Sequence, residues 1–363
     1  MNDTRKVKND GIVVACVGDI APINKAHDYI IKNESAQKER FNEQFSKYDL
    51  VLGNLETAIT TGQDIREDKR YNFSTSEKVL DVFPGKVIFS IANNHILDYG
   101  HEGLLETIRN LKRKGFRFTG AGANIDEAGE PVIIECKDKK IGFIAAADKV
   151  FGIEASKDTP GVFPADTGLI ISKIKQLKTE TDIIYLSIHM GKEYIPVPTP
   201  AMKKLADDCH EAGSDVVVFH HAHCVSGYTL KDNKATLWGT GNFIFPVSNK
   251  HHCKSWFETA SWQLQHTPDG GLKLVVNPLR INRDGFPEES TGKVNNKILK
   301  LIEHISNQIN SGKSLERLRR KYVFRISYLR LALSDYWDLT RRAGIRHVYT
   351  SILYSIRSLF RKK

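Results

Sequence analysis

The chain has 363 residues, of which 40% are hydrophobic and 26% charged, and its formal net charge is +10. This length is enough to bury a large core, and the composition lies in the ordinary range of soluble proteins. No apolar run approaches the roughly 18 residues of a membrane-spanning helix, and the polar N-terminus lacks the apolar segment of a signal peptide. We therefore expect a cytoplasmic protein.

Short apolar runs alternate with helix-like stretches over the first two thirds of the chain, which predicts an α/β fold of layered β-sheets flanked by helices. Several of the runs are rich in β-branched residues, as expected of strands covered on both faces. The predicted strands are Ile12–Val17, Leu50–Leu52, Val87–Ala92, Ile141–Ala146, Ile183–Ile188, Val216–Phe219 and Ala235–Trp238. Helical periodicity marks Gly103–Lys114 and Pro200–Ala212.

The pattern changes towards the C-terminus. Residues 255–282 alternate apolar and polar side chains, which predicts a β-hairpin or meander. Gly285–Lys293 is polar and indicates a linker, and Val294–Ile309 has helical periodicity. We therefore expect one domain over residues 1–284, followed over residues 285–363 by a linker and a helical tail.

The tail carries the positive charge of the chain. Residues 313–363 contain 14 basic and 3 acidic residues, a balance of +11, so residues 1–312 carry −1. From Leu315 onwards the cations alternate with aliphatic and aromatic residues, which predicts a basic amphipathic helix. Such a helix would bind an anionic membrane surface or a protein partner, or would pack its apolar face on the body. No nucleic-acid motif accompanies the charge, so nucleic-acid binding is not expected.

The five cysteines are odd in number, widely spaced and without a CxxC pair: Cys16, Cys136, Cys209, Cys224 and Cys253. This pattern argues against a disulfide framework and against structural zinc, so reduced thiols are expected. Cys16 falls in an apolar strand and is expected in the core. The run His251-His252-Cys253 contains metal-binding residue types but is interpreted as a loop.

Polar residues follow five of the predicted strands directly. They are Asp19, Asn54 and Glu56, Asn93 to His95, His189, and His220, His221 and His223. In open α/β sheets, ligands bind beyond the carboxyl ends of the strands, so we expect these side chains to meet at one sheet edge. Oxygen and imidazole donors together suit Mn, Fe or Zn.

Each residue also has an ordinary structural explanation. Asp19 could be a turn or N-cap residue, Asn93 and Asn94 could serve a turn, and His189 could be a hydrogen-bonded core histidine. His221 and His223 are harder to explain in this way, because alternate residues of an extended segment point to the same side. The joint occurrence at five strand ends favours a metal site.

The order of these motifs resembles the bacterial capsule-synthesis proteins of the CapA type, which are associated with poly-γ-glutamate biosynthesis and have a calcineurin-like metallophosphoesterase fold. The similarity covers about residues 11–246. The motifs are Gly18-Asp19-Ile20, Gly53-Asn54-Leu55-Glu56-Thr57, Ala92-Asn93-Asn94-His95 with Asp98-Tyr99-Gly100, Gly120-Ala121-Gly122-Ala123-Asn124, His189-Met190-Gly191-Lys192-Glu193-Tyr194, His220-His221-Ala222-His223 and Gly239-Thr240-Gly241-Asn242-Phe243.

The resemblance implies a role for each motif. It makes His95 the proton donor to a leaving oxygen and Asp98 the residue that orients it. The metal ligands would be Asp19, Glu56 with Asn54 sharing its position, Asn94, His189, His221 and His223. The residues His220, Glu193, Tyr194 and Asn242 would contact the substrate or close the pocket. Ala21 stands where two-metal phosphoesterases commonly carry a histidine, so the resemblance implies one ion, or two of unequal affinity.

The function that follows is a metal-dependent, phosphoesterase-type hydrolase in capsule or poly-γ-glutamate metabolism, acting on a phosphoester or an anionic polymer through activated water. Two alternatives stay open at this point. One is a non-hydrolytic component of a polymer-making or exporting assembly. The other is amide-bond chemistry on a γ-glutamyl polymer.

Overall fold

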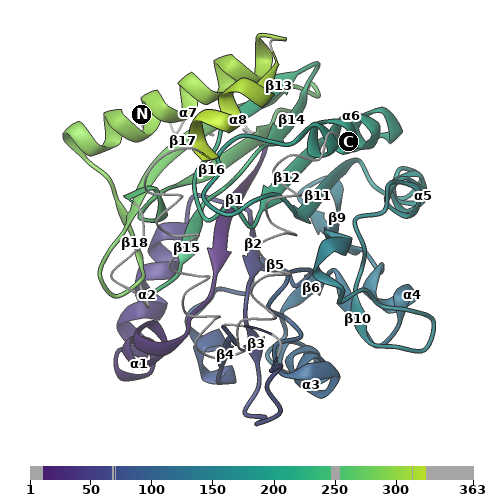
Figure 1. Ribbon diagram of the computed structural model, residues 1–363, viewed down its shortest axis with the longest axis vertical. Coiled ribbons are helices and arrows are strands. Elements are labelled where there is room, and N and C mark those ends of the chain that lie inside the picture. Colours follow the sequence, from purple (N-terminus) through teal and green to yellow (C-terminus); the bar gives the residue numbers. More distant parts are fainter. Residues whose placement is uncertain (1–10, 68, 70, 247–253, 313, 324–363) are drawn as a thin grey trace, which may run out of the picture.

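Two β-sheets packed face to face, with helices on their outer faces, form the body of the protein (Figure 1). The structure is a computed structural model that describes residues 11–67, 69, 71–246, 254–312 and 314–323. The first sheet has eight strands, in the order β18-β17-β16-β1-β2-β5-β6 with β15 beside β1. The second has six strands, in the order β13-β14-β12-β11-β9-β8.

The strands of the first sheet are β1 (Ile12–Ile20), β2 (Leu50–Leu55), β5 (Val87–Ser90), β6 (Arg117–Thr119), β15 (Asn242–Ile244), β16 (Glu258–His266), β17 (Leu272–Ile281) and β18 (Pro287–Glu289). Those of the second are β8 (Val132–Cys136), β9 (Lys139–Ala147), β11 (Ile183–His189), β12 (Val216–His220), β13 (Tyr228–Lys231) and β14 (Lys234–Leu237). Two short ladders pair β3 (Ala58–Ile59) with β4 (Ser74–Thr75) and β7 (Ala121–Gly122) with β10 (Gly161–Val162).

The helices are α1 (Asn24–Lys32), α2 (Glu34–Phe45), α3 (Gly100–Arg113), α4 (Ile125–Ala128), α5 (Thr167–Leu177), α6 (Pro200–Ala212), α7 (Gly292–Asn310) and α8 (Leu315–Val323). Short 3₁₀ turns cover Glu77–Val82, Lys149–Phe151 and Lys254–Trp256.

Alternating side chains divide the core into layers. On β1, Val14 and Cys16 pack in the core between the two sheets, whereas Ala15 and Val17 join the core shared with α1, α2 and α3. On β11, Tyr185 lies in the inner core, and its two neighbours pack with residues of α5 and α6. Successive strand residues point to opposite faces, so apolar runs without alternation are required where both faces are covered. The predicted layered α/β fold is therefore confirmed.

The predicted elements agree with the structure to within a few residues. All seven predicted strands and the hairpin of β16 and β17 are present, and α6 has the predicted bounds. Most differences are at strand ends, where β1 and β2 each continue three residues further than the apolar runs. Those extra residues include Asp19 and Asn54, whose polarity hides their strand conformation in the sequence.

The predicted linker at residues 285–293 is wrong. Pro287–Glu289 forms β18, which pairs antiparallel with β17, and α7 begins at Gly292. The segment is polar because β18 is an edge strand with exposed side chains on Glu288 and Glu289. Edge strands are often charged, since charge discourages pairing with another chain.

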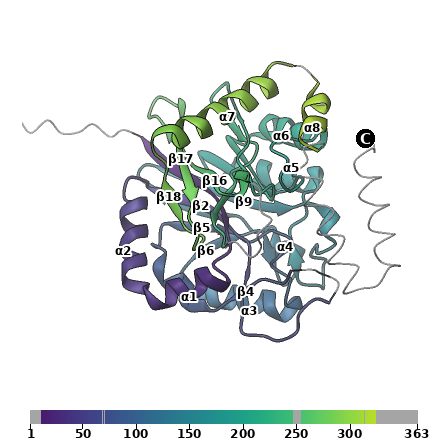
Figure 2. The same cartoon turned by 60° about the vertical axis from the view of Figure 1, so that its left-hand side comes forward.

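The predicted helix at Val294–Ile309 is confirmed, but it packs on the body. Helix α7 lies against β13 of one sheet and β17 of the other (Figure 1), and Figure 2 shows it beside β17. Its buried apolar stripe consists of Ile298, Ile302, Ile305 and Ile309. Helix α8 opens the second predicted helical region. Residues 324–363 and the run His251-His252-Cys253 lie outside the described residues.

The four described cysteines form no disulfide, and Cys16 is fully buried as predicted. Burial raises the pKa of the Cys16 thiol far above its ordinary value, which makes it an unreactive core side chain. Within the described ranges, no helix is both long and apolar enough to cross a lipid bilayer.

If α7 is part of the body, shortening one of its buried side chains destabilises the whole fold. We expect Ile302→Ala to lower the free energy of unfolding by about 2–4 kcal/mol. The exposed neighbour Glu303 supplies the control, because Glu303→Ala should change it by no more than about 0.5 kcal/mol. Urea unfolding followed by tryptophan fluorescence measures both. Equal stability of the two variants would mean that α7 does not contribute to the core.

Candidate metal centre

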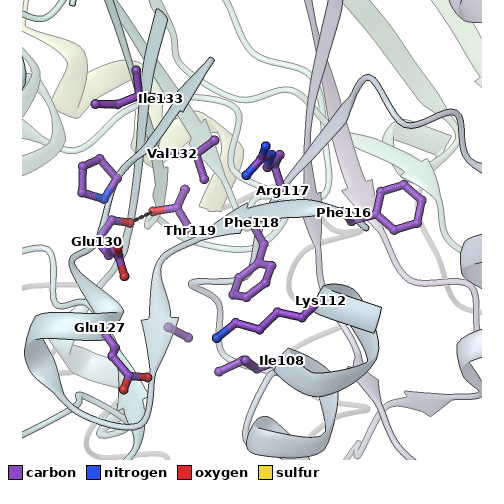
Figure 3. A pocket seen from close by; sticks show the side chains of 12 residues that line it. Ile108, Lys112, Phe116, Arg117, Phe118, Thr119, Glu127, Glu130, Val132 and Ile133 are labelled. Atoms are coloured by element: carbon purple, nitrogen blue, oxygen red, sulfur yellow. Dashed lines mark hydrogen bonds between the residues drawn. The ribbon is translucent and has the colours of Figure 1, made fainter. Parts of the chain in front are cut away.

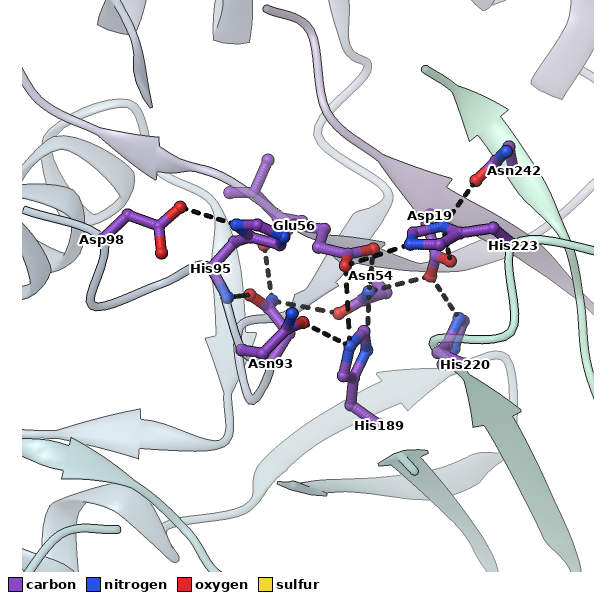
Figure 4. A network of polar contacts seen from close by, with 12 residues as sticks. Asp19, Asn54, Glu56, Asn93, His95, Asp98, His189, His220, His223 and Asn242 are labelled. Atoms are coloured by element: carbon purple, nitrogen blue, oxygen red, sulfur yellow. Dashed lines mark hydrogen bonds and ion pairs between the residues drawn. The ribbon is translucent and has the colours of Figure 1, made fainter. Parts of the chain in front are cut away.

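The predicted site residues meet where the carboxyl ends of strands from both sheets come together (Figure 4). The parallel register of β1 and β2 sets Asp19 opposite Asn54. In the second sheet, the register of β11 and β12 sets His189 opposite His220. The expectation of a single sheet edge was therefore too simple, because the site lies between two sheets.

Two carboxylates lie buried at this junction. Asp19 is 1% exposed and Glu56 is fully buried. The Asn54 side-chain amide donates to Asp19 Oδ1 at 2.8 Å and, more weakly, to Glu56 Oε2 at 3.5 Å. Burial, reinforced by the negative charge of Asp19, raises the pKa of Glu56 well above its ordinary value. A second buried carboxylate stays ionised at neutral pH only if a positive charge compensates it.

Histidines surround the two carboxylates. His189 Nε2 lies 2.8 Å from Asn94 Oδ1 and 3.6 Å from Glu56 Oε1. Burial, together with the neighbouring His221, holds the pKa of His189 well below its ordinary value. Burial also lowers the pKa of His221 to about 3, with His223 adding to the effect. Both rings are therefore neutral at physiological pH, which is the form that ligates metals.

His221 and His223 reach the site from a strained turn. Their φ angles are +88° and +51°, so both residues lie in the left-handed region, which residues other than glycine rarely adopt. The predicted extended geometry is wrong here. The turn is held from the side by Tyr194, whose backbone N–H donates to the Ala222 carbonyl at 2.8 Å. Backbone strain of this kind persists where surrounding contacts enforce it, and it clusters at functional sites.

The donor atoms form two overlapping groups, each within 4.8 Å: Glu56 with His221 and His223, and Asp19 with Glu56 and His189. Glu56 belongs to both groups. Glu56 Oε1 and His221 Nδ1 are buried and have no hydrogen-bond partner among the described residues, and buried Asp19 Oδ2 has only a contact of 3.2 Å with His223 Nδ1. Buried polar atoms normally have at least one hydrogen-bond partner. Unpartnered carboxylate and imidazole donors at this spacing fit a divalent metal such as Mn, Fe or Zn.

Other predicted residues support these donors from behind. His220 Nδ1 lies 3.2 Å from Asp19 Oδ1 and 3.0 Å from the Thr240 hydroxyl. Asn242 Oδ1 lies 2.9 Å from His223 Nδ1. His220 and Asn242 are buried, so their contacts are those of residues that orient ligands, an arrangement that is common around metals.

The carboxylate of Asp19 and the imidazole of His223 shift each other's pKa in opposite directions. Burial alone would raise the pKa of Asp19, but hydrogen bonds and charge from His220 and His223 hold it well below its ordinary value. Burial would likewise lower the pKa of His223, yet Glu56 and Asp19 outweigh it and raise this pKa to about 10. The two carboxylates therefore stabilise positive charge close to them, here that of the protonated His223 ring.

Asn54 and Asn93 form a bridge beneath the site. Asn93 Nδ2 donates to Asn54 Oδ1 at 3.1 Å and to the Leu55 carbonyl at 2.8 Å, and Asn93 Oδ1 accepts from the His95 backbone N–H at 3.1 Å. The amide oxygen of Asn54 is therefore occupied. This geometry favours a role for Asn54 in positioning the carboxylates.

His95 and Asp98 form a close pair beside the donors. His95 Nδ1 lies 2.6 Å from Asp98 Oδ2, and Asn94 directly precedes His95 in the chain. Glu193 and Tyr194 are half-buried at the rim, where the Tyr194 ring lies 5.9 Å from that of Trp256. The structure thus brings all of the predicted site residues into one region.

Sequence reasoning missed Lys69 and Phe73, which contact the His95–Asp98 pair. Both lie in the polar connection between β3 and β4, where no periodic pattern or strand end marks them.

A separate cavity of about 450 Å³ lies between α3, β6 and β8 (Figure 3). No residue of the metal centre lines it.

The fold and the donor set define an α/β protein with a candidate metal centre between two sheets. The chain belongs to the bacterial capsule synthesis protein PGA_cap family, whose model matches residues 13–247. This confirms the family resemblance seen in the motifs.

Curated relatives carry related names. The chain is 28% identical over 255 residues to the PGA biosynthesis protein CapA of Bacillus subtilis (strain 168), covering 67% of this chain and 66% of that protein. It is 25% identical over 298 residues to the capsule biosynthesis protein CapA of Bacillus anthracis, covering 78% and 71%. A putative 5'-nucleotidase structure from Staphylococcus aureus overlaps with a TM-score of 0.47 at 12% identity, over 81% of this chain and 58% of that one. That likeness is too distant to carry a conclusion.

A divalent ion that binds the buried donors should stabilise the fold. After chelation, we expect Mn²⁺ or Zn²⁺ at about 100 times its dissociation constant to add about 2.7 kcal/mol of stability, seen as a higher melting temperature. Glu56→Gln should lose this gain, because it removes the shared donor charge, and Glu303→Gln should keep it. An equal gain in both variants would place the ion elsewhere.

Proposed function

We propose that this chain is a metal-dependent hydrolase of the phosphoesterase type that acts in capsule or poly-γ-glutamate metabolism. Family membership supports the pathway. The observation that carries the reaction type is the His95–Asp98 pair beside a cluster of unpartnered, buried metal donors. A purely structural centre needs the donors but has no use for a histidine and carboxylate pair next to them.

In this proposal, six residues hold the ion or ions: Asp19, Glu56, Asn94, His189, His221 and His223. Asn54, for which the resemblance implied a share in the position of Glu56, would instead hold the two carboxylates in place. A bound divalent ion would supply the positive charge that activates a water molecule and offsets charge on the substrate oxygens. Because Ala21 stands where two-metal phosphoesterases commonly carry a histidine, the site would accept one ion, or two of unequal affinity that share Glu56.

His95 would protonate the leaving oxygen. Asp98 engages Nδ1, so Nε2 is the ring nitrogen that is left for proton transfer. Burial lowers the pKa of His95 to about 4, which favours the neutral ring. A phosphoester anion placed beside Nε2 would favour the protonated ring. The proposed donor role therefore couples protonation to substrate binding.

The substrate would be a phosphoester or an anionic polymer. Half-buried Glu193 and Tyr194 would contact it at the rim, with His220 and Asn242 closing the pocket beneath the ligands. The basic residues 313–363 would add attraction for an anionic membrane surface or a protein partner. We expect no nucleic-acid partner.

A second function is favoured by the names of the relatives, which state biosynthesis and no hydrolysis. The chain would then be a non-hydrolytic component of a capsular polymer synthesis or export assembly, and the ion would stabilise its fold. The two functions differ in the need for His95, which binds no ion in either.

Replacing His95 by glutamine tests the proposal, because the change leaves the metal donors in place. We expect His95→Gln to bind metal like the unmodified protein. Its turnover of an alkyl phosphodiester, which has a poor leaving group, should fall by about 10²–10⁴-fold. Turnover of a p-nitrophenyl ester, whose leaving group needs less protonation, should fall much less.

The control is His101→Ala, an exposed histidine on α3 whose loss should change neither activity. An equal loss on both esters would contradict the proton-donor role. If the unmodified, metal-loaded protein hydrolyses neither ester, the assembly function is favoured.

A further inference from the structure

We infer that Lys69 and Phe73 are positioning residues that clamp the His95 imidazole against Asp98 from the connection between β3 and β4. The catalytic consequence of the clamp rests on the proposed function. The clamp itself rests only on contacts among the described residues.

The buried carboxylate of Asp98 is the centre of the clamp. Asp98 is 0% exposed. Its Oδ2 accepts from the Phe73 backbone N–H at 2.7 Å and lies 2.6 Å from His95 Nδ1, while its Oδ1 accepts from the Lys69 ammonium. A carboxylate can only accept, so the proton of this His95 contact lies on Nδ1. Three donors from three different residues thus fix one carboxylate.

Lys69 ties this carboxylate to the turn that carries the candidate ligand Asn94. Its ammonium donates to the Asn94 carbonyl oxygen at 2.6 Å as well as to Asp98 Oδ1, so it spans the residues on either side of His95. Nζ also lies 3.3 Å from His95 Nδ1. The side chain is 19% exposed. Protein oxygens accept from two of the three ammonium donors, so Lys69 is suited to hold the turn.

Phe73 holds the face of the imidazole. Its ring centroid lies 3.9 Å from that of His95, and the two planes differ by 20°, which is a stacked arrangement. Phe73 cannot move freely, because its backbone N–H donates to Asp98 and its carbonyl accepts from the Ala58 N–H at 3.2 Å. The imidazole is therefore held on its edge by Asp98 and on its face by Phe73.

A backbone hydrogen bond also joins the segment between β3 and β4 to Asp98. The Arg66 N–H donates to the Asp98 carbonyl at 2.9 Å, so three residues of the connection between β3 and β4 contact Asp98. Groups held in this way keep a catalytic side chain in its productive geometry, and small misplacements cost large factors in rate. Without the Lys69 ammonium, buried Asp98 Oδ1 would lose its charged donor, and only the contacts of Oδ2 would hold the carboxylate against His95.

The test uses Lys69→Met, which keeps a long side chain but removes the ammonium. Lys78→Met is the matched control, because Lys78 is exposed. The first measurement is made on metal-free full-length protein with ¹⁵N-labelled histidine rings. The Nδ1–H signal of His95, assigned by its absence in His95→Gln, should exchange with solvent at least about tenfold faster in Lys69→Met than in the unmodified protein and in Lys78→Met.

The second measurement is turnover by the metal-loaded protein. Lys69→Met should lower kcat on an alkyl phosphodiester more than on a p-nitrophenyl ester, with metal content and KM little changed, which is the pattern expected of His95→Gln. A merely structural role would lower both activities alike. Lys69→Arg, which keeps the charge, should recover part of the exchange protection.

The outcomes separate the clamp from the proposed function. Unchanged His95 exchange in folded Lys69→Met would overturn the clamp, even if turnover is normal. Faster exchange in a protein that hydrolyses neither ester would support the clamp and contradict the hydrolase. If Lys69→Met does not fold, Phe73→Leu decides, since it keeps an apolar side chain but removes the stacked ring. It should also speed the exchange, and unchanged exchange there would overturn the inference.

Discussion

The central constraint on this protein is electrostatic. Two carboxylates, Asp19 and Glu56, are buried side by side between two sheets, and the imidazoles of His189 and His221 beside them are neutral, whereas the raised pKa of His223 favours its charged form. Taking charge out of water is unfavourable unless opposite charge or hydrogen bonds compensate. The hydrogen bonds and the His223 ring compensate only part of this charge, because Glu56 Oε1 and His221 Nδ1 have no hydrogen-bond partner among the described residues. A divalent cation is the group whose charge and bonding preferences meet the remainder.

The fold supplies this arrangement because both sheets end their parallel strands at the same place. Core packing fixes the strands, and the residues just beyond them inherit that rigidity. The cost appears in the backbone of His221 and His223, which occupies the left-handed region, and in the buried polar layer of Asn54, Asn93 and His220 behind the donors. Such local conflicts with stability are expected at functional sites.

Much of the architecture could be predicted from the sequence, because strands covered on both faces are bare apolar runs and their polar successors stand out. The donor residues were found for the same reason. The division into two sheets could not be seen, since periodicity does not tell which strands pair. The edge strand β18 was predicted as a linker because its exposed glutamates make the segment polar. Lys69 and Phe73 escaped because their importance depends on contacts across the chain, with no local pattern to mark them.

Elemental analysis of the purified full-length protein tests the central claim most directly, with His221→Ala analysed in parallel. The account predicts stoichiometric Mn, Zn or Fe in the unmodified protein and a marked loss in the variant, because His221 Nδ1 is one of the buried donors without a hydrogen-bond partner. A folded, unmodified protein that holds no metal after being supplied with Mn²⁺ or Zn²⁺ would contradict it. The buried carboxylates would then need another explanation.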